Sequence, residues 1–380
     1  MIFDKNELIE TIEEGVAGNA VNAPIGFKKL EAGGVKLFPK CYTLIGGFPG
    51  SGKSAFLHDA YILNPYEWWK HQKETVGTDL EFYWLLWSME RPLLELKLKW
   101  VARRVFQITK KLKEPILLDV AFLKGFKSSK VTPEIKKIVF DTFDYMEEMF
   151  SYIEVKAATN PTGVYKEVKN YALKVGTIEE TPYVTRDGIT KTTKTYKKNN
   201  PKRITVIGID HLGKLNGETV EGVYLKPESR ELIQRMSMFC SSEFRDFYGF
   251  SPIIVGQFNR NIENSARFGS GKDSVIPQPS DFKNSATPFE DSDTVLALFN
   301  PHKIGLDEFP TNGYKMNKLI LPDGENRFRA LTVLKNSYGV DDVTYGLGFL
   351  GGIGKFTELK KPSEMKDIDY FNIMNIKKVY

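Results

Sequence analysis

The chain has 380 residues, of which 41% are hydrophobic and 13% aromatic, a composition that excludes a disordered protein. Its net charge of +5 is compatible with a polyanionic partner but too small to require one. Two cysteines, Cys41 and Cys240, exclude a disulfide framework or a cysteine-rich metal cluster. The N-terminus lacks the pattern of a signal peptide, and no apolar run approaches the ~20 residues of a membrane span. We therefore expect a soluble protein of the reducing cytoplasm, without a membrane partner.

The N-terminal region predicts a short amphipathic helix over Asn6–Val16, with Asn6 as its cap. A link rich in glycine and asparagine follows, so we expect residues 1–24 to form a linker helix ahead of the main domain. The apolar positions Leu8, Ile9, Ile12 and Val16 share one face of this helix. A helix this short is marginal alone, so its apolar face is covered either by its own domain or by a neighbouring subunit.

A glycine-rich turn then joins a strand at Tyr42–Gly46 to a helix that continues to Leu63. The turn reads G-x-x-x-x-G-K-S in the strand–loop–helix context of a phosphate-binding loop. Glycines let backbone N–H groups surround phosphate oxygens, Lys53 can reach the β- and γ-phosphates, and the Ser54 hydroxyl can ligate Mg²⁺. We expect Lys53 to be exposed when the loop is empty. The predicted ligand is a nucleoside triphosphate, taken as ATP with Mg²⁺, and the predicted contacts are Gly47, Phe48, Pro49, Gly50, Ser51, Gly52, Lys53, Ser54 and Ala55.

Strands and helices alternate through most of the remaining chain, which predicts an α/β fold with a mostly parallel twisted sheet flanked by helices. The predicted strands are Leu80–Ser88, Tyr152–Lys156, Arg203–Asp210, Pro252–Gln257, Asp293–Phe299, Lys315–Leu321 and Phe328–Lys335. The predicted helices are Pro92–Phe106, Glu134–Phe150, Asn160–Val175 and Glu228–Tyr248. No repeat and no second domain boundary are evident.

Three segments interrupt this alternation. Gly176–Lys202 predicts a β-hairpin insertion around the Asp187-Gly188 turn, and its lysine- and threonine-rich return arm is either a solvated decoration or a nucleic-acid contact. Asn261–Gln278 is long, polar and glycine-bearing, which is typical of a mobile loop. After Gly346 a glycine-rich stretch leads to a polar C-terminal tail, residues 359–380.

Three polar side chains end predicted strands, and the carboxyl ends of parallel strands meet at one edge of a sheet. Asp210 suits a second Mg²⁺ ligand beside Ser54, and Glu90 is placed to orient or deprotonate water. Gln257 can contact a γ-phosphate and report its loss. The alternatives are structural: Asp210 as the cap of a loop, and Glu90 as an acid in the first turn of a helix. His211 is assigned to packing.

The order of these motifs resembles the ATPase domain of DnaB-like replicative helicases, which form hexamers around a RecA-like core. The resemblance runs over residues 25–358 and rests on Ile25–Leu30 before Gly33-Gly34, Gly46–Ser54, Trp87–Glu90, Ile207–Leu212, Val255–Arg260, Pro279–Ser285 and Glu290–Asp293. It implies a RecA-like P-loop NTPase core with Glu90 as catalytic glutamate, Asp210 for Mg²⁺ and Gln257 as sensor. It also implies that single-stranded DNA binds the loop before Pro279, with Arg260, Arg267 and Lys272 as basic candidates.

The chain departs from the family's pattern in three places. The K-x-R-x-G segment, which serves the neighbouring subunit's ATP, is Lys335–Gly339 here, with Lys335 kept and Ser337 in the arginine position. We expect Lys335, helped by Arg327 or Arg329, to make that contact. The Asn6–Val16 helix stands in the place of the family's linker helix, without its N-terminal domain, and the hairpin insertion is extra. Such a divergent form is typical of a phage genome.

Two functions follow from the resemblance. The first is an ATP-hydrolysing DNA helicase or translocase that acts on single-stranded DNA in replication, as a hexameric ring, in a bacterial or phage-infected cell and with replication proteins as possible partners. The second is a non-unwinding RecA-core ATPase, such as a loader, a recombination mediator or a regulatory ATPase. The intact Glu90, Asp210 and Gln257 favour the first function, and Ser337 favours the second.

Overall fold

The computed structural model describes residues 9, 12–13, 22–110, 115–125, 132–185, 187–259, 275–282, 286–310, 313–322 and 324–376. Most of the predicted helix Asn6–Val16 and most of the loop Asn261–Gln278 lie outside these residues. Among the helices that are described, none is both long and apolar enough to cross a membrane.

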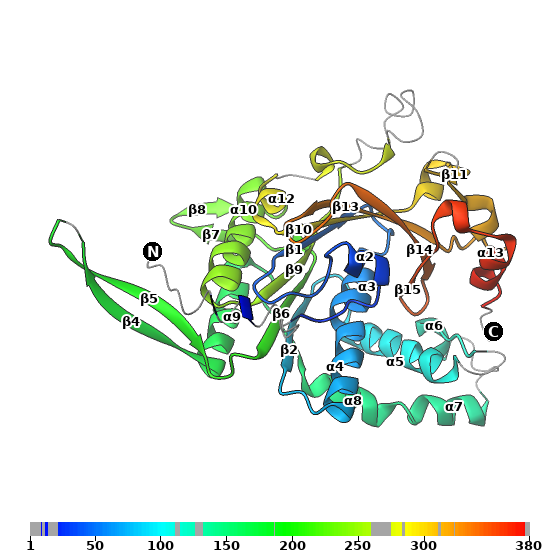
Figure 1. Ribbon diagram of the computed structural model, residues 1–380, viewed down its shortest axis with the longest axis horizontal. Coiled ribbons are helices and arrows are strands. Elements are labelled where there is room, and N and C mark those ends of the chain that lie inside the picture. The colour runs from blue at the N-terminus through cyan, green and yellow to red at the C-terminus, as the bar shows by residue number, and fades with distance from the viewer. Residues whose placement is uncertain are drawn as a thin grey trace.

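One nine-stranded sheet forms the centre of the molecule, in the order β15-β14-β13-β10-β1-β9-β6-β2-β3 (Figure 1). Six neighbouring strands are parallel: β1 (Thr43–Gly47), β2 (Glu81–Ser88), β3 (Ile153–Val155), β6 (Arg203–Asp210), β9 (Ser251–Val255) and β10 (Thr294–Phe299). Three antiparallel strands extend it on the β10 side: β13 (Phe328–Asn336), β14 (Val343–Leu350) and β15 (Lys355–Glu358). The predicted mostly parallel α/β sheet is therefore confirmed.

The sheet separates two hydrophobic cores because successive side chains of a strand point to opposite faces. On β2, Trp84 and Leu86 enter one core, whereas Leu85 and Trp87 enter the other. The first core is covered by α3 (Lys53–His58), the π-helical turn η1 (Asp59–Leu63), α4 (Asn64–Thr75), α5 (Leu93–Thr109) and α8 (Phe143–Ser151). The second is covered by α9 (Pro161–Val175), α10 (Arg230–Met238) and the π-helix η4 (Phe239–Phe247). Burial on both faces explains why the parallel strands are apolar throughout.

Two predicted helices differ from the structure in their extent. The helix after the phosphate-binding loop continues beyond Leu63 to Thr75, because Tyr66 and Trp69 of α4 are buried. The single helix predicted for Glu134–Phe150 is two, α7 (Pro133–Phe140) and α8, because the Thr142 hydroxyl donates to the Val139 carbonyl (2.7 Å) at the break.

The predicted strand Lys315–Leu321 is wrong for most of its length. Only Tyr314–Lys315 (β12) pairs, with Glu308–Phe309 (β11), and a 3₁₀ helix η9 follows at Met316–Leu319. Met316 and Leu319 are both buried, and their i,i+3 spacing is that of a 3₁₀ turn rather than of a strand.

The glycine-rich stretch after Gly346 is not a loop but the β14–β15 hairpin. A Cβ on Gly346 would lie 2.3 Å from the Tyr314 ring, so glycine permits that close approach. The polar C-terminal segment contains a helix, α13 (Asp367–Met374), and Tyr370 of this helix is buried in a third hydrophobic cluster.

The predicted hairpin insertion is present. Strands β4 (Gly176–Val184) and β5 (Thr190–Lys198) pair antiparallel along their full length, directly after α9. Figure 1 shows the hairpin projecting away from the central sheet. Two further short strands, β7 (Glu218–Val220) and β8 (Val223–Leu225), form a small hairpin that the sequence did not predict.

Candidate nucleotide-binding site

The phosphate-binding loop lies between β1 and α3, at the carboxyl edge of the sheet. Gly50 (φ +74°) and Gly52 (φ +100°) adopt left-handed backbone conformations that other residues rarely adopt. A Cβ on Gly47 would lie 2.4 Å from the Leu298 carbonyl oxygen of the neighbouring strand β10. Glycine is therefore required at these positions by backbone conformation or by space.

Three cationic side chains hold carbonyl groups of the loop. Lys53 Nζ donates to the Phe48 carbonyl (2.8 Å), Lys303 Nζ to the Pro49 carbonyl (3.2 Å) and Arg329 Nε to the Ser51 carbonyl (2.9 Å). Lys303 lies on the 3₁₀ helix η8 (Pro301–Ile304) and Arg329 on β13. Sequence reasoning missed both supports, because neither belongs to the loop motif and both reach it only through the fold.

The expected exposure of Lys53 is wrong. Its side chain is buried, and burial lowers the pKa of its ammonium group to about 8, against the opposing effects of Asp210 and Glu90. Lys53 must exchange the Phe48 carbonyl for a phosphate oxygen if it is to bind a nucleotide. The physical reason for burial is that α3 packs directly beneath the loop, so the first helical side chain has no path to solvent.

Asp210 ends β6 and lies beside Ser54, whose hydroxyl donates to the Asp210 Oδ1 (2.9 Å). Asp210 is completely buried, and among the described residues its Oδ2 has no hydrogen-bond partner. Burial is the largest cause that raises the pKa of this carboxyl, to about 6, and Glu90 adds to it, whereas the Ser54 hydrogen bond lowers it. A hydroxyl and a carboxylate with an unused oxygen are the hard oxygen ligands that Mg²⁺ prefers.

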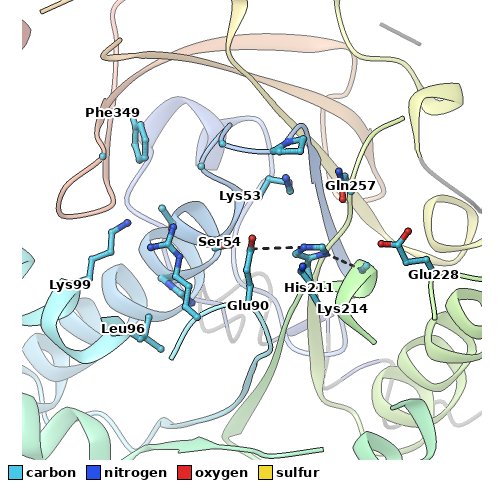
Figure 2. A pocket seen from close by; sticks show the side chains of 18 residues that line it. Lys53, Ser54, Glu90, Leu96, Lys99, His211, Lys214, Glu228, Gln257 and Phe349 are labelled. Atoms are coloured by element: carbon cyan, nitrogen blue, oxygen red, sulfur yellow. Dashed lines mark hydrogen bonds and ion pairs between the residues drawn. The ribbon is translucent and has the colours of Figure 1, made fainter. Parts of the chain in front are cut away.

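Glu90 and Gln257 follow the carboxyl ends of β2 and β9 and line the same cleft, whose volume is about 450 Å³ (Figure 2). The Glu90 carboxylate is about half exposed (47%), so water reaches it. Gln257 is half-buried. The structure thus brings Lys53, Ser54, Glu90 and Gln257 together, as the shared sheet edge predicts.

His211 also lines this cleft, although its sequence assignment was packing. Its Nδ1 accepts a hydrogen bond from the Gly213 N–H (3.0 Å), and its Nε2 lies 3.9 Å from Glu90 Oε2. Burial lowers the pKa of His211, with Glu90 acting in the opposite direction. Its position one residue beyond a strand-end aspartate was the sequence signal that could have placed it here.

The cleft extends past Ala55 along α3 and α5. Lys99, Leu96 and Phe349 line that part, together with the buried His58, and Figure 2 shows the first three on the side away from Gln257. Burial lowers the pKa of Lys99 to about 8, and Arg91 acts in the same direction. None of these residues was predicted, because they come from three elements far apart in the sequence.

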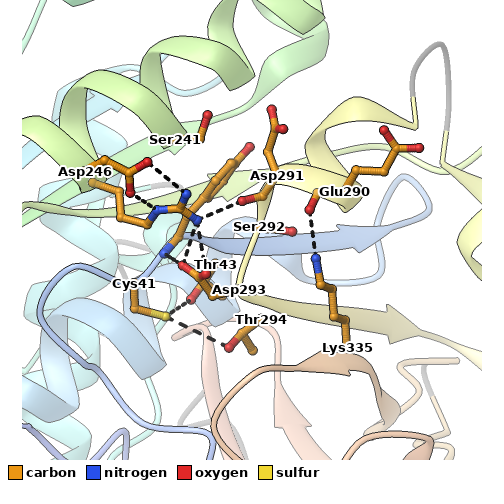
Figure 3. Close-up of polar contacts among 12 residues, drawn as sticks. Cys41, Thr43, Ser241, Asp246, Glu290, Asp291, Ser292, Asp293, Thr294 and Lys335 are labelled. Carbon is orange, nitrogen blue, oxygen red and sulfur yellow. Dashed lines mark hydrogen bonds and ion pairs between the residues drawn. The ribbon is translucent and has the colours of Figure 1, made fainter. Parts of the chain in front are cut away.

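Lys335 does not reach the phosphate-binding loop of its own chain. Its ammonium group donates to the Glu290 carbonyl (2.8 Å) and the Phe289 carbonyl (3.3 Å), near the carboxyl end of α12 (Thr287–Asp291) (Figure 3). The expected help from Arg327 or Arg329 is wrong, since both are buried. Arg327 donates to the carbonyls of Ile373 (2.8 Å) and Ile376 (2.7 Å), and Arg329 holds the loop.

The predicted DNA-contacting residues Arg260, Arg267 and Lys272 lie outside the described residues. Their role therefore stays a prediction.

The sheet order, the phosphate-binding loop and the carboxylate beside Ser54 define an α/β fold of the RecA-like P-loop class. Solved structures place the fold more narrowly. An ATPase domain of a DnaB-like helicase aligns with a TM-score of 0.58 and 15% identity, over 95% of this chain and 100% of that one. A DnaB-like replicative helicase, described together with its interactions with primase, aligns with a TM-score of 0.56 and 15% identity, over 95% and 68%.

The chain therefore has the fold of the DnaB-like helicase ATPase domain, which confirms the predicted fold. No family model and no curated protein sequence match the chain. The similarity is thus one of three-dimensional structure.

Proposed function

We propose that this protein is an ATP-driven motor of the DnaB-like type that moves along or unwinds single-stranded DNA during replication. Residues 25–358 form its motor core, and copies of the chain assemble into a hexameric ring, by analogy with the fold of its neighbours. Its place of action is the cytoplasm of a bacterial or phage-infected cell. The observation that carries the proposal is the Ser54–Asp210 pair, with its unused buried carboxylate oxygen, directly beneath the phosphate-binding loop.

The residues present fit ATP and Mg²⁺. Loop residues 47–55 surround the phosphates, Lys53 moves from the Phe48 carbonyl to a phosphate oxygen, and Ser54 with Asp210 holds the metal. When bound, Mg²⁺ neutralises negative charge on the phosphates. The Asp210 carboxyl must be ionised to act as a ligand, and with a pKa of about 6 it is ionised at pH 7 and above.

Glu90 acts as the general base or water-orienting group in this proposal. Its carboxylate is accessible to water and lies at the mouth of the cleft that Lys53 lines. His211, held through the Gly213 N–H, keeps its Nε2 toward Glu90 and limits the positions that the carboxylate can take. Gln257, on the next strand along the sheet from Asp210, senses the γ-phosphate through its amide.

The direct test is ATP hydrolysis with and without single-stranded DNA, run beside a strand-displacement assay. Lys53→Ala is expected to abolish ATP binding and hydrolysis, whereas Lys28→Ala, which removes an exposed lysine outside the cleft, keeps both. Thermal denaturation checks that both variants are folded. Normal turnover by Lys53→Ala would place the nucleotide elsewhere.

A non-unwinding RecA-core ATPase is the second candidate, and one observation favours it. Ser337, in the arginine position, is exposed and uncharged, Lys335 is engaged by carbonyls of its own chain, and Arg329 is buried. An arginine supplied by a neighbouring subunit contributes roughly 10³–10⁵ in rate to such enzymes, so its loss favours slow turnover. ATP hydrolysis that DNA stimulates, without strand displacement, would support this second function.

Mixing two inactive variants tests whether Lys335 acts on a neighbouring subunit. Lys335→Ala and Glu90→Gln subunits each lack a different half of a shared site, so a mixture regains turnover if the site is shared. Light scattering measures assembly in the same samples. No recovery at any ratio, with a monomeric protein, would contradict the ring.

A further inference from the structure

A second groove lies at the amino edge of the central sheet, at the opposite end of the strands from the nucleotide cleft. It runs between the base of the β4–β5 hairpin and the end of η4, and its volume is about 630 Å³. Lys198 joins the two walls, because its ammonium group donates to the Gly249 carbonyl (2.8 Å) and the Arg203 carbonyl (3.2 Å). The hairpin in Figure 1 therefore has a fixed base, and the groove is a permanent feature of the surface.

Lysine side chains dominate the charge of this groove. Lys40, Lys194, Lys197 and Lys198 line it, and Asp246 is its one acidic lining residue among those described. Lys194 pairs with Glu180 (2.7 Å) on the hairpin, and Asp246 accepts from Arg245 (2.7 Å).

The ammonium groups of Lys40 and Lys197 differ from the others. Both side chains are exposed, and within the described ranges neither ammonium has a hydrogen-bond or ion-pair partner. Burial is the main cause that lowers the pKa of the nearby Lys198 to about 8, and Lys40 and Arg203 act in the same direction. The groove thus carries positive charge that the described part of this chain does not neutralise and that an anionic ligand would.

Aromatic rings stand beside these ammonium groups. Tyr196 and Phe247 are half-buried and line the groove, with ring centroids 6.4 Å apart. The Tyr196 hydroxyl donates to the Ala172 carbonyl (2.8 Å), and its ring meets Tyr248 edge-on at 5.1 Å. The rings are therefore held in place and offer a rigid apolar surface next to the positive charge.

We propose that this groove binds single-stranded nucleic acid, with backbone phosphates at Lys40 and Lys197 and a base against Phe247 or Tyr196. Cationic grooves with aromatic surfaces suit single strands, because unpaired bases expose faces that can stack. Lysines on an exposed hairpin also oppose edge-to-edge aggregation. That role does not require Lys40, which lies on another element, nor aromatic rings beside the lysines.

Binding here is independent of the nucleotide, because the groove and the cleft lie at opposite edges of the sheet. The test is fluorescence anisotropy of a labelled oligothymidylate with the full chain, without ATP, over a range of salt concentrations. Two removed phosphate contacts lower the salt slope by about 1.4, which corresponds to a roughly 25-fold loss of affinity at 0.1 M salt. We expect this loss for the double variant Lys40→Gln/Lys197→Gln.

Matched controls are the exposed lysines Lys191, toward the hairpin tip, and Lys174, on α9, which lie outside the groove. Lys191→Gln/Lys174→Gln removes the same charge and is expected to keep the parent's slope. Repeating the titration in an Arg267→Ala/Lys272→Ala background removes the other predicted contact. An unchanged slope for the groove variant, or an equal fall for the control, overturns the proposal.

Two further measurements identify the ligand class. Phe247→Leu should weaken the oligonucleotide by roughly fivefold or more, while an abasic strand of equal length binds Phe247→Leu and parent alike. Polyglutamate that competes as well as the oligonucleotide would overturn the nucleic-acid assignment. Lys53→Ala should bind like the parent, so that failure of the proposed ATPase leaves this result readable.

Discussion

Two aspartates at opposite edges of the same sheet are treated in opposite ways. Asp293, just before β10 at the amino edge, accepts from the Tyr42 N–H (2.8 Å) and from Arg245 Nη1 (3.0 and 3.1 Å). Arg245 also donates to Asp246 and to the Asp291 carbonyl, which lie around Asp293 in Figure 3. Asp210, at the carboxyl edge, has the Ser54 hydroxyl on one oxygen and, among the described residues, no hydrogen-bond partner on the other.

The difference separates a structural carboxylate from one reserved for a ligand. Asp293 joins η4, β1 and β10, so its hydrogen bonds serve the fold. A buried carboxylate oxygen without a partner costs folding free energy. Such local violations of good packing chemistry are expected at functional sites. We therefore interpret Asp210 as part of a site that folding leaves incomplete and that a cation completes.

The largest effect should come from the carboxyl edge. Glu90→Gln keeps the shape of the side chain but loses its basic oxygen, so turnover should fall by ~10²-fold or more while ATP is still bound. Single-turnover hydrolysis and nucleotide-binding titrations measure the two properties separately. Loss of binding together with turnover would make Glu90 a structural residue and narrow the comparison to Asp210 alone.

At the amino edge the effect should be on stability. Asp293→Ala leaves the largely buried Arg245 guanidinium and the Tyr42 N–H without an acceptor, so the free energy of unfolding should fall by about 2–3 kcal/mol. Urea denaturation measures it. Asp246→Ala is the control, because this exposed partner of Arg245 should change stability by less than about 1 kcal/mol. Equal effects of the two variants would remove the contrast.

Asp210→Asn should have the opposite sign, a gain of stability of about 1–2 kcal/mol at pH 8 with loss of Mg²⁺-dependent turnover. The pKa of Asp210 rises from 3.8 to about 6 on folding. The folded state therefore holds more protons between these values, and the parent loses stability as pH rises through them. The full shift corresponds to about 3 kcal/mol, and the buried asparagine amide keeps part of that cost.

The pH dependence separates this cause from others. Below about pH 4 Asp210 is protonated in the folded state and largely so in the unfolded state, so parent and Asp210→Asn should converge in stability. Denaturation curves of both proteins at about pH 4, 6 and 8 show whether they do. A constant difference across this range would exclude the ionisation of Asp210 as its source.

The smallest effect concerns the support of the phosphate-binding loop. Lys303→Ala removes an exposed donor to the Pro49 carbonyl, so the KM for ATP should rise by about fivefold at most, with unchanged stability. Steady-state kinetics and thermal denaturation measure both quantities. A large loss of stability would show that Lys303 serves the fold, as Asp293 does.

The sequence by itself predicted the fold class and the shared sheet edge of Ser54, Glu90, Asp210 and Gln257. Both follow from local patterns: apolar strands, a glycine-rich turn, and the rule that carboxyl ends of parallel strands lie together. The β-hairpin was readable for the same reason, because its turn and its two strands are adjacent in the chain.

Tertiary structure decided the rest. The burial of Lys53 depends on how α3 packs beneath its loop, and Arg329 reaches the Ser51 carbonyl across 278 residues of sequence. The basic groove joins Lys40, Lys197 and Phe247, which no local period connects. Strand order and helix packing set these distances, and they depend on the whole sheet closing around its two cores rather than on any one segment.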